Sequence, residues 1–213
     1  MARRNSPAGF AAVALAVALG SAVFAEQPRW TWRDRPPVVV DHPVLGASLA
    51  RLYAGSPRWR DALNEVANTG RRVVLITPDK VRVRDQSGGR ETPFDPEVLA
   101  EVQPIADDWS RVDTVVVVIN LPLLDRLYSD ATPADLDADL DRILAHEIYG
   151  HAIPYLLAGH LGGKCADPLP KQRATDACAI KRENEIRSEL RLGERRGYGL
   201  DGLTIARRYR FNF

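Results

Sequence analysis

Two histidines and a glutamate form the most chemically specific pattern in this chain. Residues 144–151 read LAHEIYGH, so Glu147 directly follows His146, and His151 comes five positions after His146. Imidazole nitrogens are common zinc ligands, and a carboxylate beside the ion can accept a proton from a bound water. In the pattern His-Glu-x-x-His, two histidines one helical turn apart hold the metal. We therefore predict that His146 and His151 bind a metal ion, most simply Zn²⁺, with Glu147 as the general base.

The spacing of the two histidines is one residue longer than in His-Glu-x-x-His. On a regular α-helix, residues four apart are rotated by about 40° and residues five apart by about 140°. A π-helical turn, with hydrogen bonds between residues five apart, would bring both imidazoles to one side. Gly150 relaxes the backbone, and Pro154 lacks an N–H and would clash with the carbonyl of Gly150. We predict a widened turn over residues 146–151. The alternative is two helix histidines on different faces, with Glu147 as a surface charge.

A third metal ligand is expected from another part of the chain. The candidates are Asp176, Glu183, Glu185, His160 and the two cysteines. If the motif helix runs to Gly159 and an antiparallel helix starts near Lys171, that second helix returns to the level of the histidines about ten residues later. This geometry favours Glu183. Asp176, on nearly the same face, is the main alternative, whereas Glu185 is expected to face solvent.

The two cysteines, Cys165 and Cys178, bracket the loop between the two expected helices. In an oxidising compartment, a disulfide between them is the simplest interpretation, and zinc ligation is the alternative. Such a bond would hold the second helix against the metal-binding helix.

The first 25 residues have the pattern of a secretory signal. Arg3 and Arg4 precede an uncharged apolar stretch, and Val23 and Ala25 suit the positions before a cleavage site. We therefore expect export to the periplasm or the medium, with cleavage after Ala25 and no stable membrane span afterwards. The alternative is an uncleaved anchor, although the apolar stretch is short for a membrane span.

The remaining chain predicts a single α+β domain. Residues 26–43, rich in Trp and Pro, are expected to form an extended arm, and residues 44–213 the domain itself. A small sheet is expected first, followed by the motif helix and an antiparallel ligand helix.

Individual elements follow from local signals. Ser56-Pro57 and Thr132-Pro133 have the capping pattern of helix starts, with ends at Gly70 and Gly159. The last helix is expected from about Lys171 to Leu192. The β-branched runs at 72–77 and 81–84 predict a hairpin, residues 96–102 a short helix, and residues 113–120 a buried strand.

Composition narrows the classes of function. The chain has 29 Lys and Arg against 28 Asp and Glu, which gives a formal net charge of +1. Such a balance argues against a protein that binds nucleic acid through a basic surface. The sequence does not define an oligomeric state.

The motif residues also resemble known metallopeptidases. His146-Glu147-Ile148-Tyr149-Gly150-His151 resembles the His-Glu-x-x-Gly-His variant of dipeptidyl peptidase III, in which a downstream Glu completes the metal site. Ala179-Ile180, Glu183-Asn184-x-x-Arg187 and Arg195-x-x-Tyr198 are similar to small effector-type zinc metallopeptidases of the zincin group. These resemblances imply a compact domain with a sheet ahead of the active-site helix.

The sequence thus predicts an exported zinc peptidase that acts on a peptide or protein substrate. Tyr198 or Arg187 could donate a hydrogen bond to the oxyanion of the transition state, although Arg187 is also placed to pair with Glu183. The valine-rich strand at 115–118 could pair with an extended substrate. Two alternatives remain: a zinc-stabilised, non-catalytic binding module of the cell envelope, and a metal-free exported domain.

Overall fold

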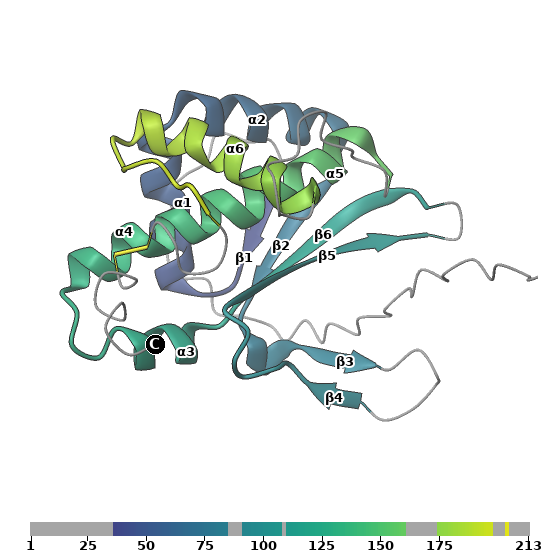
Figure 1. Cartoon of the computed structure of the whole chain (residues 1–213). Helices are drawn as coiled ribbons and strands as arrows, with labels where there is room; N and C mark the ends of the chain where they lie inside the picture. The colour runs from purple at the N-terminus through teal and green to yellow at the C-terminus, as the bar shows by residue number, and fades with distance from the viewer. Residues whose placement is uncertain (1–35, 85–90, 108–109, 161–173, 198–202, 205–213) are drawn as a thin grey trace, which may run out of the picture.

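A four-stranded sheet with a layer of helices on one face organises the molecule (Figure 1). The structure is a computed structural model that describes residues 36–84, 91–107, 110–160, 174–197 and 203–204; at Lys80, 82–84, 91–93 and 174–176 it describes only the backbone. The strands of the sheet are β1 (Val38–Val40), β2 (Arg72–Ile76), β6 (Val112–Ile119) and β5 (Ala100–Ala106), in that spatial order. The α+β class predicted from the sequence is confirmed.

The first three strands are parallel, and β5 is antiparallel to β6. The alternating side chains of β6 face opposite ways: Val115, Val117 and Ile119 contact the helices, whereas Val116 and Val118 pack on the other face. On that second face they meet Ile76, Val81 and Phe94. Because both faces are covered, β6 reads as a continuous apolar run, as the sequence predicted for a buried strand.

Two helices connect β1 to β2, as a parallel pair requires. They are α1 (Pro43–Gly55) and α2 (Pro57–Thr69). Ser56 caps α2 by accepting the N–H of Trp59, and Gly70 ends it in the left-handed conformation, both as predicted. Trp59 is completely buried, which anchors α2 to the core.

The segment between β2 and β6 differs from the prediction. The hairpin expected between 72–77 and 81–84 is wrong, because β2 lies inside the sheet and its edges pair with β1 and β6. After a 3-10 turn (η1, Pro78–Lys80), β3 (Arg82–Arg84) pairs instead with β4 (Glu91–Pro93). This small hairpin lies on the sheet face opposite the helices (Figure 1).

The short helix expected at 96–102 is also wrong, since residues 100–106 form strand β5. Pro104 pairs in register with Val115 and lies in the strand at the end of the sheet order. Proline is tolerated in such a position, because its missing N–H can point away from the neighbouring strand. The sheet contact therefore outweighs the weak local preference of this segment for a helix.

Two further elements were not predicted from the sequence. Val38–Val40 lies within the expected extended arm, but it joins the sheet as β1. A short helix, α3 (Leu121–Leu127), follows β6 and is capped by Asn120, whose side chain accepts the N–H of Leu123.

The long helix that carries the motif begins where the sequence predicted. Its parts are α4 (Pro133–Leu144), a π-helical segment η2 (Ala145–Ala152) and α5 (Ile153–Ala158). Thr132 and Asp135 form a capping box at its start, and Gly159 ends it with a positive φ of 73°. The last described helix, α6 (Ala174–Glu189), packs along η2 and ends three residues before the predicted Leu192; residues 171–173, where its start was predicted, lie outside the described residues.

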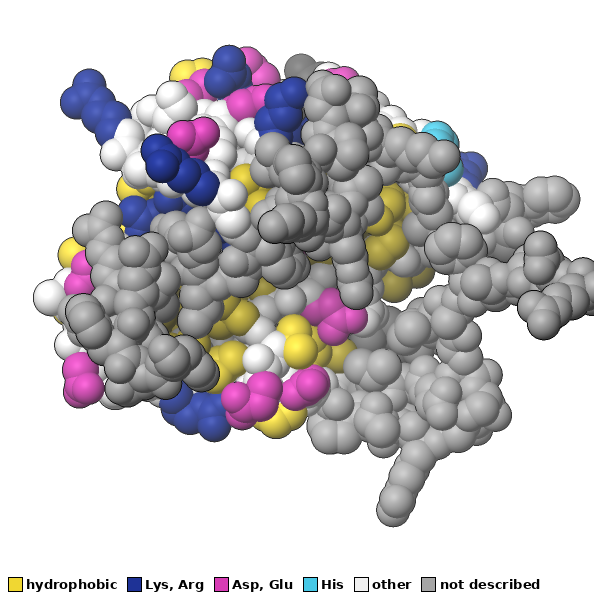
Figure 2. Space-filling model, viewed as in Figure 1, with side chains coloured by type: hydrophobic (Ala, Val, Ile, Leu, Met, Phe, Trp, Pro, Cys, Tyr) yellow, Lys and Arg dark blue, Asp and Glu magenta, His cyan; other side chains and the backbone are white. Residues whose placement is uncertain are grey.

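Two further observations concern the charges on the surface and the search for a helix that could cross a membrane. In Figure 2, basic and acidic side chains of the described residues lie interspersed on the face in view. Within the described ranges, no helix is long and apolar enough to cross a membrane. Residues 1–25, where the signal was predicted, lie outside the described residues, so cleavage and export stay predictions.

Candidate metal centre

The predicted widening of the motif helix is confirmed. Residues 145–152 are π-helical, and the N–H of Ile153 donates to the carbonyl of Ile148, five residues earlier. Pro154 follows at the start of α5. Since Pro154 cannot donate an N–H and its ring would clash with the carbonyl four residues before it, the wider turn relieves a conflict that an α-helix would contain.

The π-helical turn brings the two histidine rings together. Nε2 of His146 lies 3.3 Å from Nε2 of His151, with the ring planes at 83° to each other. Two zinc–nitrogen bonds of ~2.0–2.1 Å at a tetrahedral angle would place their nitrogens about 3.3 Å apart. The observed separation thus matches a pair of metal ligands. It also permits a hydrogen bond between the rings, so a metal titration distinguishes the two.

Glu147 completes a group of three donors that could hold a metal ion. One ligand atom each from His146, Glu147 and His151 lies within 4.8 Å of the others. His146 is only 4% exposed, and the other two side chains are partly exposed. The chemistry of this set, two imidazoles and one carboxylate with access to solvent, fits a borderline-soft divalent ion such as zinc.

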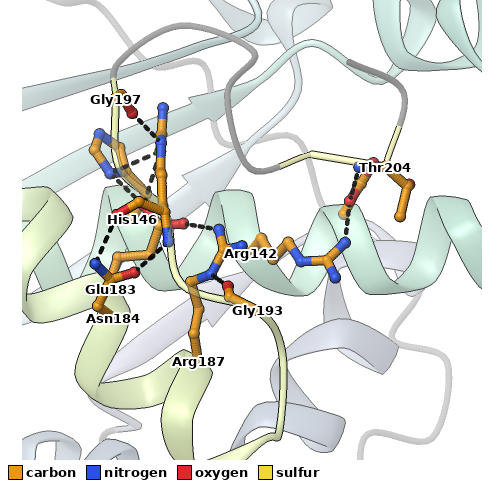
Figure 3. A network of polar contacts seen from close by, with 10 residues as sticks. Arg142, His146, Glu183, Asn184, Arg187, Gly193, Gly197 and Thr204 are labelled. Carbon is orange, nitrogen blue, oxygen red and sulfur yellow. Dashed lines mark hydrogen bonds and ion pairs between the residues drawn. The ribbon is translucent and has the colours of Figure 1, made fainter. Parts of the chain in front are cut away.

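The carboxylate of Glu183 lies on the other side of the His146 ring. Its Oε2 is 2.9 Å from Nδ1 of His146, and the side chain has no exposed surface (Figure 3). Arg187 donates to Oε1 at 2.8 Å, and Arg195 donates to Oε2 at 2.7 Å. Glu183 is therefore at the level of the histidines, as the helix geometry predicted, but it contacts Nδ1 and is not in the three-donor group.

The contacts of Glu183 fit a proton on Nδ1 of His146, because an ionised carboxylate can only accept hydrogen bonds. Arg195 Nη1 also lies 3.2 Å from Nδ1 of His146, but a guanidinium only donates. The carboxylate is the acceptor that Nδ1–H and Arg195 share, because Oε2 is the closer atom for both groups. This arrangement leaves the lone pair of Nε2 directed away from Glu183, on the side of His151.

Burial and neighbouring charges shift two pKa values at the site. Burial, followed by the charges of His146 and Arg195, lowers the pKa of His151 to about 4, so its imidazole is neutral at pH 7. Burial by itself would raise the pKa of Glu183, but the hydrogen bond from His146 and the charge of Arg195 outweigh it, and the net pKa is lowered. A neutral imidazole is the form in which His151 could bind a metal ion.

A close approach between η2 and α6 sets the register of the two helices. A Cβ on Gly150 would lie 2.9 Å from both Cα and Cβ of Ala179, so only glycine fits there. Gly150 thus faces Ala179, and one turn away His146 faces Glu183, which shows that α6 runs antiparallel to η2. Gly150 has a packing role in addition to the backbone freedom inferred from the sequence.

The segment after α6 is tied back onto that helix. Asn184 Nδ2 donates to the carbonyl of Arg195, and the N–H of Arg195 donates to Oδ1 of Asn184, each at 2.8 Å. Arg187 Nε donates to the carbonyl of Gly193 at 2.5 Å, and Arg195 Nε to that of Gly197 at 2.9 Å (Figure 3). These bonds hold the guanidinium of Arg195 against Glu183.

The other predicted site residues have varied placements. Arg187 is 2% exposed and pairs with Glu183, which confirms the pairing expected from their spacing. Glu185 does not simply face solvent, since it is partly buried and accepts a hydrogen bond from the hydroxyl of Tyr149 at 3.1 Å. His160 is exposed at the end of the motif helix and forms a β-bridge with Arg111.

Several predictions fall outside the described residues. Tyr198 and Cys165 are not described, and of Asp176 only the backbone is described. The oxyanion role of Tyr198, the disulfide between Cys165 and Cys178, and the ligand role of Asp176 therefore stay predictions.

Strand β6 cannot pair with a substrate, because β2 and β5 occupy both of its edges. That prediction is wrong. The long valine run that suggested strand pairing is instead the mark of a central strand, covered on both faces.

Reasoning from the residues alone missed the part of Arg195 in this site. Arginine at that position was noted only within the resemblance to small metallopeptidases. The turn that returns it to α6 depends on Asn184, and no periodic pattern signals a contact between residues eleven positions apart.

The chain matches no family model, no curated protein and no solved structure.

Proposed function

We propose that this protein is an exported zinc-dependent peptidase of the zincin type. The observation that carries the proposal is the π-helical turn, which brings the Nε2 atoms of His146 and His151 to 3.3 Å with the carboxylate of Glu147 in the same group. A His-Glu pair followed by a second His on the same helix is the arrangement by which zinc peptidases hold their ion.

Each residue of the group has a defined part in this proposal. Bound zinc would lower the pKa of its water toward neutrality and polarise a peptide carbonyl. His146 and His151 bind through Nε2, and Glu147 accepts a proton from the attacking water and returns it to the leaving amine. Tyr198 remains the proposed donor to the oxyanion, because Arg187 is committed to Glu183 and the carbonyl of Gly193.

The end strand of the sheet that lies near the motif helix could pair with a substrate strand. Strand β5 ends the sheet order, and it packs near η2. An extended peptide paired with the outer edge of β5 would lie beside the helix that carries His146 and Glu147. We therefore move the proposed substrate contact from β6 to β5.

The test of this function combines metal content with hydrolysis. Purified full-length protein should bind one zinc ion per chain and cleave a mixed library of fluorogenic peptides. Glu147→Gln should retain the zinc and lose at least a hundredfold in rate, since a general base contributes roughly 10²–10⁴. Asp113→Asn is a control, because this exposed acid pairs with Arg71 and Arg111 and is not in the three-donor group.

The same measurements separate the alternative functions. If wild-type protein binds zinc but Glu147→Gln changes no measurable property, the protein is a zinc-stabilised binding module. If Glu147→Gln loses zinc together with activity, Glu147 is a ligand and not the base. Absence of zinc binding by the wild-type protein would contradict both metal-dependent functions.

A further inference from the structure

We propose that Glu183 is a positioning residue for the metal centre: held by Arg187 and Arg195, its carboxylate fixes the ring of His146 with the proton on Nδ1 and the lone pair of Nε2 on the side of His151. The inference rests on the proposed metal site, and it replaces the expectation that Glu183 is the third ligand.

The geometry of an imidazole separates the two roles. A metal bound at Nε2 with a bond of ~2.0–2.1 Å would lie about 4 Å from Nδ1 of the same ring. Glu183 Oε2 lies 2.9 Å from Nδ1. Because the two nitrogens point to nearly opposite sides of the ring, that oxygen would be about 7 Å from the ion, well beyond the ~2.0–2.2 Å of a zinc–oxygen bond.

The surroundings of Glu183 hold its carboxylate in one orientation. Arg187, 2% exposed, engages Oε1, and Arg195, 7% exposed, engages Oε2 together with His146. Arg187 and Arg195 are in turn fixed through carbonyls of the segment after α6. Such a network leaves the carboxylate little freedom to rotate toward the ion.

The function of this arrangement follows from how histidine binds metals. The nitrogen that does not contact the metal commonly donates to a carboxylate, which selects the tautomer and makes the ligand more basic. Loss of such a partner typically weakens metal binding 10–100-fold without removing a ligand. The guanidinium groups of Arg187 and Arg195 compensate the charge of this buried carboxylate.

The first test needs no variant. Two-bond ¹H–¹⁵N correlation spectra of the metal-free protein, labelled at its four histidines, should show His146 as the Nδ1–H tautomer. A crystal structure with bound zinc should show no oxygen of Glu183 within bonding distance of the ion. An Nε2–H tautomer at His146, or a zinc–oxygen bond to Glu183, would overturn the inference.

The second test compares two glutamates of α6. Glu183→Gln should still bind one zinc ion per chain, but with an affinity 10–100-fold lower in competition with a chelator. Glu185→Gln is the matched control, because Glu185 contacts Tyr149 and not an imidazole, and its affinity should stay within about twofold of wild type. Complete loss of the zinc site in folded Glu183→Gln would show that Glu183 is a ligand.

These outcomes are separable from failure of the proposed function. If the wild-type protein binds no zinc, the function itself fails. If it binds zinc and Glu183 is a ligand, only this inference fails. Should Glu183→Gln not fold, the wild-type spectra and the zinc-bound structure decide the question.

Discussion

Two carboxylates are completely buried in the described part of the chain, one on the motif helix and one on α6, and their partners differ in kind. Asp139, on α4, accepts hydrogen bonds from the hydroxyl of Tyr128, from Arg142, and from the N–H and hydroxyl of Thr204. Glu183, on α6, accepts from two arginines and an imidazole. Burial and dense hydrogen bonding are thus common to both.

The two carboxylates differ in the further contacts that their hydrogen-bond partners make. Tyr128 and Thr204, the partners of Asp139, are not in the group of three possible metal donors. Burial, followed by the hydrogen bond to Asp139, raises the pKa of Tyr128 above its ordinary value. The partner of Glu183, His146, has a second nitrogen that faces another imidazole. The comparison indicates that Asp139 serves stability, and it fits the proposed role of Glu183 in orienting His146.

The largest effect on stability is expected at Asp139. Asp139→Ala leaves the charge of Arg142 and the N–H of Thr204 without their acceptor, and removing one partner of a buried ion pair costs about 3–5 kcal/mol. Zinc affinity, measured well below the unfolding temperature, should not change. Urea unfolding and a zinc titration check the two parts.

Asp137→Ala is the control for Asp139. Asp137 is on the same helix, but half of its side chain is exposed and its pair with Arg51 should contribute at most about 1 kcal/mol. Loss of zinc binding in folded Asp139→Ala would break the proposed division between the two carboxylates.

An intermediate effect is expected where η2 meets α6. In Gly150→Ala the added Cβ would lie 2.9 Å from the backbone of Ala179, so α6 must move away, at a cost of about 1–3 kcal/mol. Because α6 carries Glu183, zinc affinity should fall together with stability. Thermal unfolding with and without zinc measures both.

Gly193→Ala is the matched control for Gly150→Ala. No atom lies within 4 Å of a Cβ at Gly193, and the carbonyl that accepts from Arg187 is kept. The thermal stability and the zinc affinity of Gly193→Ala should both equal those of the wild-type protein. If Gly150→Ala destabilises the fold but leaves zinc affinity intact, the contact between the two helices does not position Glu183.

The smallest effect is expected from Pro154→Ala. The new N–H could donate to Gly150 and favour a regular α-helix, which would turn His151 away from His146. We expect a change in stability below about 1 kcal/mol and less than tenfold weaker zinc binding, because α6 packing also supports the π-helical turn. Pro133→Ala, at the first turn of α4, is the control, since no N–H is required there.

An unchanged zinc affinity in Pro154→Ala would show that packing against α6 is sufficient to maintain the π-helical turn. If Pro154→Ala loses more zinc affinity than Gly150→Ala, the expected order of the two variants is reversed. Pro154 would then be the main determinant of the histidine geometry.

Sequence reasoning succeeded where a local conflict had one resolution. The motif at residues 146–151, which is followed by Pro154, could bring its two histidines together only through a wider helical turn. That turn is present. Helix starts with a hydroxyl residue before Pro were also predicted, because capping depends on neighbours in the chain.

Prediction failed where distant contacts decide the outcome. Ala100–Ala106 has no strong preference of its own, and only its pairing with β6 makes it a strand. In the same way, helix geometry brought Glu183 to the level of His146 but did not reveal which side of the ring it occupies. That detail depends on Arg195, which is positioned by backbone bonds to Asn184.

The contact between Arg195 and Glu183 has a consequence for the order of events during synthesis. Translation yields both histidines roughly fifty residues before the guanidinium that orients one of them. Chains still emerging from the ribosome therefore lack this anchor for the ring of His146. On this view the ring of His146 takes its final orientation only after Arg195 has been synthesised.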